Sequence, residues 1–98
     1  MVFCRLDVLN ILKKFKSDFA EKYGIVSIGI FGSAARNELN ENSDIDVCIE
    51  TLTPNPFLIF TIKEELEKLF KRPVDIVRIR KMMNDHLKKR IEKDGVYV

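Results

Sequence analysis

The sequence is poor in the residues that build disulfide scaffolds, metal clusters and low-complexity segments. It contains two cysteines, one histidine, three prolines and four glycines in 98 residues, too few for a disulfide framework, a zinc cluster or a disordered chain. Its longest apolar stretches, such as 57–62, are far too short to cross a bilayer. The N-terminus has no basic segment leading into an apolar one, so no signal peptide is predicted. We therefore expect a soluble cytoplasmic protein with no membrane partner.

The net charge is close to zero and excludes few classes of binding partner. The formal net charge is +2, with 46% hydrophobic and 33% charged residues, a mixture ordinary for one globular domain, expected to span residues 1–98. Basic residues gather between 78 and 93, where they can form an RNA-binding surface or, more commonly, a solvated helix face. Nucleic acid is therefore not the expected partner. Cys4 and Cys48 have apolar surroundings and are expected to be buried thiols in a reducing compartment.

Hydrophobic periodicity predicts helices that alternate with strands. The first helix ends near Gly24 and carries an apolar stripe of Leu6, Leu9, Leu12, Phe15 and Phe19. A second helix starts at Pro56 with Asn55 as its cap. The other predicted elements are strands at 25–31, 44–50 and 74–79, a short helix at 34–36 capped by Ser33, a last helix from Met82 to Lys93 and an apolar tail at 96–98. This order predicts an α/β (α+β) domain with a small sheet covered by helices mainly on one face.

A glycine and a serine stand where the first predicted strand passes into the short helix. Gly32 allows the backbone to approach a ligand closely, and free amides at a helix start point towards anions. The hydroxyl of Ser33 can donate a further hydrogen bond to a phosphate oxygen, and Arg36 adds a fixed positive charge nearby. A turn with a helix cap is the commoner explanation of a Gly-Ser pair. Taken alone, the pair is therefore only a weak indication of phosphate binding.

Two aspartates project from one face of the second predicted strand. Period-two alternation places Asp44 and Asp46 on the face opposite to Ile45 and Val47, and like charges on one face repel each other. A cation relieves this repulsion, and oxygen ligands are those that Mg²⁺ prefers. The alternative is an edge strand whose polar side lies in water, and the pair alone does not decide between the two.

A third aspartate interrupts the apolar strand 74–79. An unpaired carboxylate there costs free energy unless it finds a partner. Asp75 can join Asp44 and Asp46 if the third strand lies beside the second; otherwise it is a surface residue at the start of its strand. The glycine turn and the three carboxylates together indicate metal-assisted phosphoryl chemistry, in which two ions about 4 Å apart stabilise the attacking and leaving oxygens.

The order and spacing of these residues closely resemble the signature of the minimal nucleotidyltransferases (MNT) of the DNA polymerase beta superfamily. That signature reads Gly-Ser, then Ala-Arg-Gly-Glu, a spacer, Ser-Asp-Ile-Asp and a third aspartate on a later strand. The matching residues are Gly32-Ser33, Arg36, Glu38, Ser43-Asp44-Ile45-Asp46-Val47 and Asp75. The match covers essentially the whole chain and implies a polymerase-beta-like fold with a mixed sheet. Asn37 departs from the usual glycine, although asparagine also tolerates a left-handed backbone.

The resemblance implies a role for each matching residue. The nucleotide would be bound by Gly32, Ser33, Arg36 and Ser43. Asp44 and Asp46 would coordinate two Mg²⁺ ions, and Asp75 would bind the catalytic ion and help to deprotonate an acceptor hydroxyl. That hydroxyl would attack the α-phosphate of ATP while pyrophosphate leaves.

The resemblance also implies a partner. Many members of the family are encoded beside a HEPN-domain toxin and transfer AMP from ATP to a tyrosine of that toxin, so we expect a HEPN/MNT antitoxin that works in a homo- or hetero-oligomer. The alternatives are an antitoxin that neutralises by binding alone and a nucleotidyltransferase acting on a small molecule. Phe57, Phe60 and Phe70 can form a partner-binding patch, although helical spacing favours their packing in the core or in partly buried positions.

Overall fold

The computed structural model describes residues 4–40, 42–80 and 83–98. A four-stranded sheet with the strand order β3-β2-β1-β4 forms its middle layer. The strands are β1 (Ile25–Phe31), β2 (Ile45–Thr51), β3 (Val74–Arg78) and β4 (Val96–Tyr97). Because β2 and β3 are parallel while β1 is antiparallel to both β2 and β4, the sheet is mixed.

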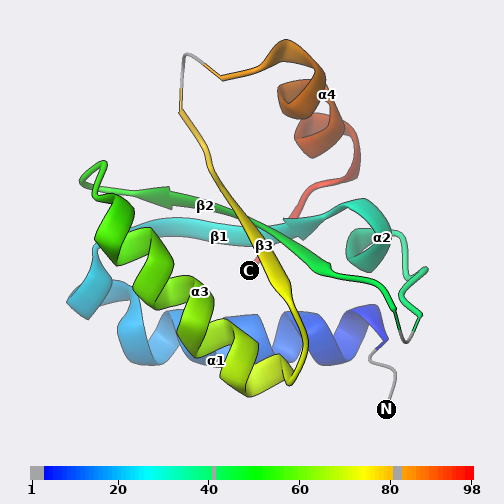
Figure 1. Cartoon of the computed structure of the whole chain (residues 1–98), viewed down its shortest axis with the longest axis horizontal. Helices are drawn as coiled ribbons and strands as arrows, with labels where there is room; N and C mark the ends of the chain where they lie inside the picture. Colours follow the sequence, from blue (N-terminus) through cyan, green and yellow to red (C-terminus); the bar gives the residue numbers. More distant parts are fainter. Residues whose placement is uncertain (1–3, 41, 81–82) are drawn as a thin grey trace.

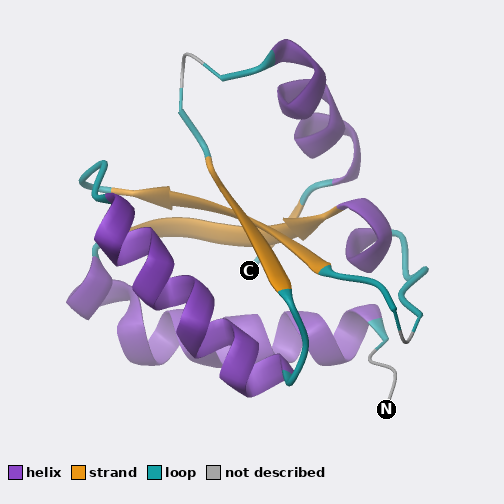
Figure 2. Ribbon diagram, viewed as in Figure 1, coloured by secondary structure: helices purple, strands orange, loops and turns teal. Residues whose placement is uncertain are grey.

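Two long helices cover one face of this sheet. The helices α1 (Arg5–Tyr23) and α3 (Pro56–Phe70) lie below the sheet in Figure 1, whereas α4 (Asp85–Asp94) lies on the opposite side. The short helix α2 (Gly32–Ala35) follows β1 directly, as Figure 2 shows. The predicted α/β architecture, with helices mainly on one face, is therefore confirmed. Among the described residues, no helix is long and apolar enough to cross a membrane.

The main core fills the space between the sheet and the two long helices. Ile45, Val47 and Ile49 of β2 are buried on this side, as their period-two spacing predicts. The other fully buried side chains of this core are Val8, Leu12, Phe15, Ile28, Ile30, Ile62, Leu66 and Phe70. Alternate residues of β1 and β2 therefore point towards α1 and α3, and the residues between them point to the other face.

The first helix ends as predicted but buries a different stripe. Gly24 terminates α1 with φ 63°, and its N–H donates to the carbonyl of Ala20. The buried residues include Val8 and Leu12, whereas the side chain of Leu6 is 65% exposed. Leu6 precedes Val8 by two positions, which places it roughly 200° around the helix. The prediction that Leu6 belongs to the buried stripe was therefore wrong.

The start of α3 follows the predicted capping pattern. The Asn55 Oδ1 atom accepts hydrogen bonds from the backbone N–H groups of Phe57 and Leu58 at 3.0 and 3.4 Å. Phe70 is buried, but Phe57 is 83% exposed and Phe60 is 60% exposed. The expectation of core packing was wrong for these two, because they lie three positions apart on the side of α3 that faces away from the sheet.

The second face of the sheet carries a smaller apolar cluster. Phe31 of β1 and Cys48 of β2 are buried there against Ile91 of α4. The described part of this helix begins at Asp85, with the Asn84 side chain as its cap, and the predicted start at Met82 lies outside the described residues. One helix therefore covers the face from which the even-numbered residues of β2 project.

The last residues form a strand and not the expected tail. Gly29 pairs with Tyr97 and Ile30 with Val96 in an antiparallel ladder. A Cβ atom on Gly29 would overlap the carbonyl oxygen of Val96, so the absence of a side chain permits this close pairing. A strand of two residues is too short for periodicity to reveal.

Both cysteines are free, but their surroundings differ. Cys48 is buried, as predicted, whereas Cys4 is exposed. Cys4 immediately precedes α1, where the backbone has not yet reached the sheet. The prediction of a buried thiol was therefore wrong for Cys4.

We predict that replacing Phe15 with alanine lowers the free energy of unfolding by about 3–5 kcal/mol, because it leaves a cavity in the main core. The matched substitution Leu6→Ala should change it by no more than about 0.5 kcal/mol, since that side chain already lies in solvent. Urea denaturation followed by circular dichroism measures both values. Equal losses for the two variants would contradict the assignment of the buried stripe.

Candidate active site

The sheet topology brings the predicted site residues to one end of the sheet. Because β1 is antiparallel to β2, the last residue of β1 lies beside the start of β2, and Phe31 pairs with Asp46. Because β2 and β3 are parallel, their starts lie together, and Asp46 pairs with Asp75 in register. Asp44 immediately precedes the first residue of β2, two positions before Asp46 in the sequence. Three segments that are distant in sequence therefore meet at this end.

The carboxylate of Asp46 lies in an unfavourable electrostatic environment. Burial raises its pKa, and the negative charges of Asp75 and Asp44 raise it further, while Arg90 and Arg36 act in the opposite direction. Asp46 is half-buried, whereas Asp44 and Asp75 are exposed. A bound cation would remove the repulsion, because it adds the positive charge that the site lacks.

The glycine turn contacts the same carboxylate. Gly32 has φ +66°, a left-handed conformation that side chains rarely adopt. A Cβ atom at this position would overlap Oδ2 of Asp46. Both the backbone conformation and the space therefore require glycine here. The turn lies directly against Asp46, which forms an acidic pair with Asp75 on the neighbouring strand.

The short helix begins two residues earlier than predicted, at residue 32 and not at residue 34. Gly32 is its first residue and Phe31 occupies the N-cap position without a side-chain hydrogen bond. Ser33 therefore lies inside the first turn and does not cap it, which corrects that prediction. Its carbonyl accepts a hydrogen bond from the backbone N–H of Glu38 at 2.8 Å. The backbone of Ser33 is thus tied to the loop that follows α2.

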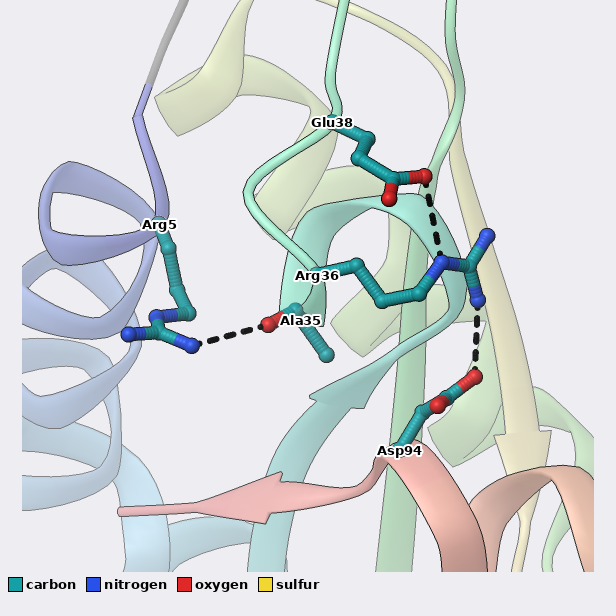
Figure 3. Close-up of polar contacts among 5 residues, drawn as sticks. All are labelled: Arg5, Ala35, Arg36, Glu38 and Asp94. Atoms are coloured by element: carbon teal, nitrogen blue, oxygen red, sulfur yellow. Dashed lines mark hydrogen bonds and ion pairs between the residues drawn. The ribbon is translucent and has the colours of Figure 1, made fainter.

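Arg36 links the glycine turn to the last helix. Its Nη1 atom lies 2.7 Å from Oδ2 of Asp94, and its Nε atom lies 3.2 Å from Oε2 of Glu38 (Figure 3). Hydrogen bonds to Glu38 and Asp94 raise the pKa of the guanidinium group. In this arrangement its donors point to carboxylates of the protein, so the predicted contact between Arg36 and the nucleotide stays a prediction.

Asn37, at the position where the family usually has glycine, has a left-handed backbone conformation. Its φ is 60°, in the left-handed region. Its Oδ1 atom accepts a hydrogen bond from the backbone N–H of Arg5 at 2.7 Å, and the side chain of Arg5 donates to the carbonyl of Ala35 (Figure 3). Asparagine therefore accommodates the backbone conformation of this loop, and its side chain connects the loop to the start of α1.

Ser43 holds the turn that precedes the first aspartate. Its hydroxyl oxygen accepts a hydrogen bond from the backbone N–H of Asn40 at 3.2 Å. One guanidinium nitrogen of Arg72 donates to the carbonyls of Asn40 and Ser43 at 3.1 and 3.2 Å. These contacts position the backbone that leads to Asp44, and the predicted nucleotide contact of Ser43 stays a prediction.

One residue at this end of the sheet was not predicted as part of the site. The guanidinium carbon of Arg90, on α4, lies 5.7 Å from the centroid of the Phe31 ring. Its Nη2 atom lies 3.6 Å from the position that a Cβ atom on Gly32 would occupy. In the sequence Arg90 is one of several basic residues between 78 and 93, and only the packing of α4 distinguishes it from them.

The three aspartates do not form a complete metal site by themselves. Within residues 4–40, 42–80 and 83–98, no three histidine, cysteine or carboxylate side chains lie close enough together to hold an ion. Mg²⁺ in nucleotide-binding sites takes one or two protein carboxylates and completes its shell with water and substrate phosphates. The paired Asp46 and Asp75, with Asp44 beside them, provide such a donor set. The joint coordination of metal by all three stays a prediction.

Comparisons with known proteins agree with this geometry. The protein-family profile described as "Nucleotidyltransferase domain" matches residues 12–98. A Methanocaldococcus jannaschii protein, provisionally named protein adenylyltransferase MJ0128, is 42% identical over 93 residues, which cover 94% of this chain and 95% of that protein. The Thermococcus cleftensis protein adenylyltransferase MntA is 30% identical over 93 residues, which cover 94% and 93% of the two chains.

A solved structure shares the fold. It contains a tri-AMPylated Shewanella oneidensis HEPN toxin in complex with an MNT antitoxin and matches with a TM-score of 0.69 and 19% identity, over 95% of this chain and 70% of the matched one. The fold and the sequence match thus lead to one conclusion: the chain belongs to the nucleotidyltransferase domain family.

Proposed function

We propose that this enzyme transfers AMP from ATP to a tyrosine hydroxyl of a partner protein, the HEPN-domain toxin of a toxin–antitoxin pair. The observation that carries the proposal is the in-register pairing of Asp46 with Asp75 directly beside the Gly32 turn. Carboxylates and a glycine turn on one sheet edge are suited to a metal-bound triphosphate.

In this proposal Mg²⁺ would be held by the acidic residues together with the phosphates of ATP. Asp44 and Asp46 would coordinate the ions, and Asp75 would coordinate the catalytic one. The chemistry that bound Mg²⁺ supplies is neutralisation of phosphate charge at the reacting centre. The unfavourable environment of Asp46 in the metal-free protein supports this assignment, because a cation stabilises its charged form.

The remaining residues bind and orient the substrates. Gly32 and Ser33 hold the triphosphate, and Ser43 and Arg36 bind the nucleotide. Asp75 accepts the proton of the tyrosine hydroxyl, whose oxygen forms a bond to the α-phosphorus as the bond to pyrophosphate breaks. Most of the rate enhancement then comes from orientation and charge neutralisation.

The acceptor and partner are proposed on the basis of the relatives. MJ0128 and MntA are named protein adenylyltransferases, and this chain matches nearly their whole length. The structurally similar antitoxin is bound to an AMPylated HEPN toxin. The exposed side chains of Phe57 and Phe60 on α3 offer an apolar surface for such a partner.

We predict that Asp44→Asn lowers AMP transfer to the HEPN-domain partner by roughly a hundredfold or more, since removal of one preorganised electrostatic group costs about that much. The enzyme, its partner and Mg²⁺ are incubated with ATP labelled at the α-phosphate, and the labelled partner is separated by electrophoresis. Asp18→Asn, the same change on an exposed residue of α1, should leave the rate unchanged.

A parallel incubation with ATP labelled at the γ-phosphate should leave the partner unlabelled, because pyrophosphate leaves and the AMP moiety is transferred. Label from γ-phosphate would indicate phosphorylation and contradict the proposal. Tight association of the two proteins with no label from either nucleotide would identify a non-catalytic antitoxin.

We predict that Asp46→Asn makes the metal-free protein more resistant to heat at neutral pH. The folded-state pKa of Asp46 is raised above its ordinary value of 3.8, so the folded protein holds the proton more tightly than the unfolded chain. Stability from this group is therefore fully present below that ordinary pKa and declines as pH rises through the folded-state pKa. The advantage of the variant should be small at acid pH and larger at neutral pH.

Thermal denaturation in the presence of a chelator, repeated at several pH values, measures this difference. Glu50→Gln, on the same strand but at an exposed position, is the matched control and should not show the same pH-dependent gain. A melting temperature of Asp46→Asn below that of the wild type at neutral pH would contradict the proposed repulsion.

A further inference from the structure

The last helix is fixed at two points beside the candidate active site. Ile91 is buried against Phe31 and Cys48 on the second face of the sheet. Asp94 pairs with Arg36 at the end of α2, with 2.7 Å between Oδ2 and Nη1 (Figure 3). In Figure 1, α4 lies on the side of the sheet opposite to α1 and α3. The helix is therefore held in one orientation over the end of β1.

This orientation places Arg90 at the glycine turn. The position of a Cβ atom on Gly32 would lie 3.6 Å from Nη2 of Arg90 and would overlap Oδ2 of Asp46. The arginine and the aspartate therefore border the same small space beside Gly32. The guanidinium carbon lies 5.7 Å from the centroid of the Phe31 ring, within the range of a cation–π contact. The ring and the fixed helix together keep the positive charge at this place.

Two arginines lie near the acidic pair, and they differ in what they bind. Arg36 forms ion pairs with Glu38 and Asp94. Arg90 forms no ion pair with any carboxylate in the described part of the chain, and it is exposed. The N–H donors of Arg90 are thus open to a ligand, whereas two of those of Arg36 are occupied.

The negative group that lies nearest to Arg90 differs between the protein without ligands and the protein with bound metal and nucleotide. Its neighbour at this space is Asp46, whose Oδ2 atom also borders the position of a Cβ atom on Gly32. Divalent ions held by the carboxylates would offset the negative charge of Asp46, and the bound triphosphate would then be the nearest unpaired negative charge. Arginine binds phosphate oxygens through paired N–H donors, and such charge-assisted bonds are stronger than neutral ones.

We infer that Arg90 is a phosphate-binding residue of this nucleotidyltransferase: its guanidinium group contacts the triphosphate of the metal-bound nucleotide beside Gly32. Asp94 and Ile91 are positioning residues for this contact, because they hold α4 in place. The inference rests on the proposed function in one respect, namely that a metal-bound nucleoside triphosphate occupies this end of the sheet.

Two binding measurements test the inference without reference to turnover. The first is the affinity for Mn²⁺ alone, measured by electron paramagnetic resonance. The second is the affinity for a non-hydrolysable ATP analogue at saturating Mn²⁺, measured by calorimetry. Both use the wild type, Arg90→Ala, Arg90→Lys and the control Lys89→Ala. Lys89 is an exposed neighbour on α4 that projects about 100° away from Arg90, so its loss removes the same charge from a different direction.

Arg90→Ala should weaken the binding of the analogue by about ten- to a hundredfold, the range of a charge-assisted hydrogen bond. It should leave Mn²⁺ affinity unchanged or raise it, because a positive charge is removed from the neighbourhood of Asp46. Arg90→Lys should lie between the wild type and Arg90→Ala, since it keeps the charge but loses the planar fork. Lys89→Ala should behave as the wild type.

Two results would overturn the inference while the proposed function stands. One is equal affinity of the wild type and Arg90→Ala for the analogue. The other is a parallel loss of Mn²⁺ and analogue binding in Arg90→Ala, which would mean that the arginine only maintains the shape of the site. Failure of the wild type itself to bind the analogue with Mn²⁺ would instead refute the proposed function, and with it this inference.

Discussion

The parallel pairing of β2 and β3 places two aspartates side by side at the start of both strands, and the surrounding structure is organised around their repulsion. Asp46 cannot move away from Asp75 because Ile45 and Val47 on either side of it are buried in the core. Gly32 leaves room for its carboxylate, and Arg90 offsets part of its charge. Asp46 thus lowers the stability of the fold but is held in place by well-packed neighbours, and such destabilising residues are typical of functional sites.

Most of the fold could be predicted because its elements have strong periodic patterns. Three strands, the two long helices and the caps at Gly24 and Asn55 follow from local spacing and from backbone preferences. The exposure of Leu6, Phe57 and Phe60 could not be predicted, because periodicity identifies an apolar side chain but not which side of the helix meets the sheet. The two-residue strand β4 depends on a partner strand that is distant in sequence.

The candidate site was only partly predictable, for a related reason. The glycine and the three aspartates could be recognised in the sequence. Gly32 follows a strand at a predicted turn, and aspartate is rare in strands, where Asp46 and Asp75 lie and which Asp44 precedes. Arg90 gives no such signal, since arginine is ordinary on a solvated helix face. Its place in the site depends on how α4 crosses the sheet, and that orientation comes from a buried isoleucine and from an ion pair between Arg36 and Asp94.

The position of α4 also affects how the chain folds during its synthesis. Synthesis proceeds from the N-terminus, so α1, α3 and three of the strands leave the ribosome before α4 and β4 exist. The main core can close at that stage, but Phe31 and Cys48 on the second face are covered only when Ile91 arrives. The nascent chain therefore carries an apolar surface beside its acidic pair until α4 is made, and that surface is where aggregation or a chaperone would first act.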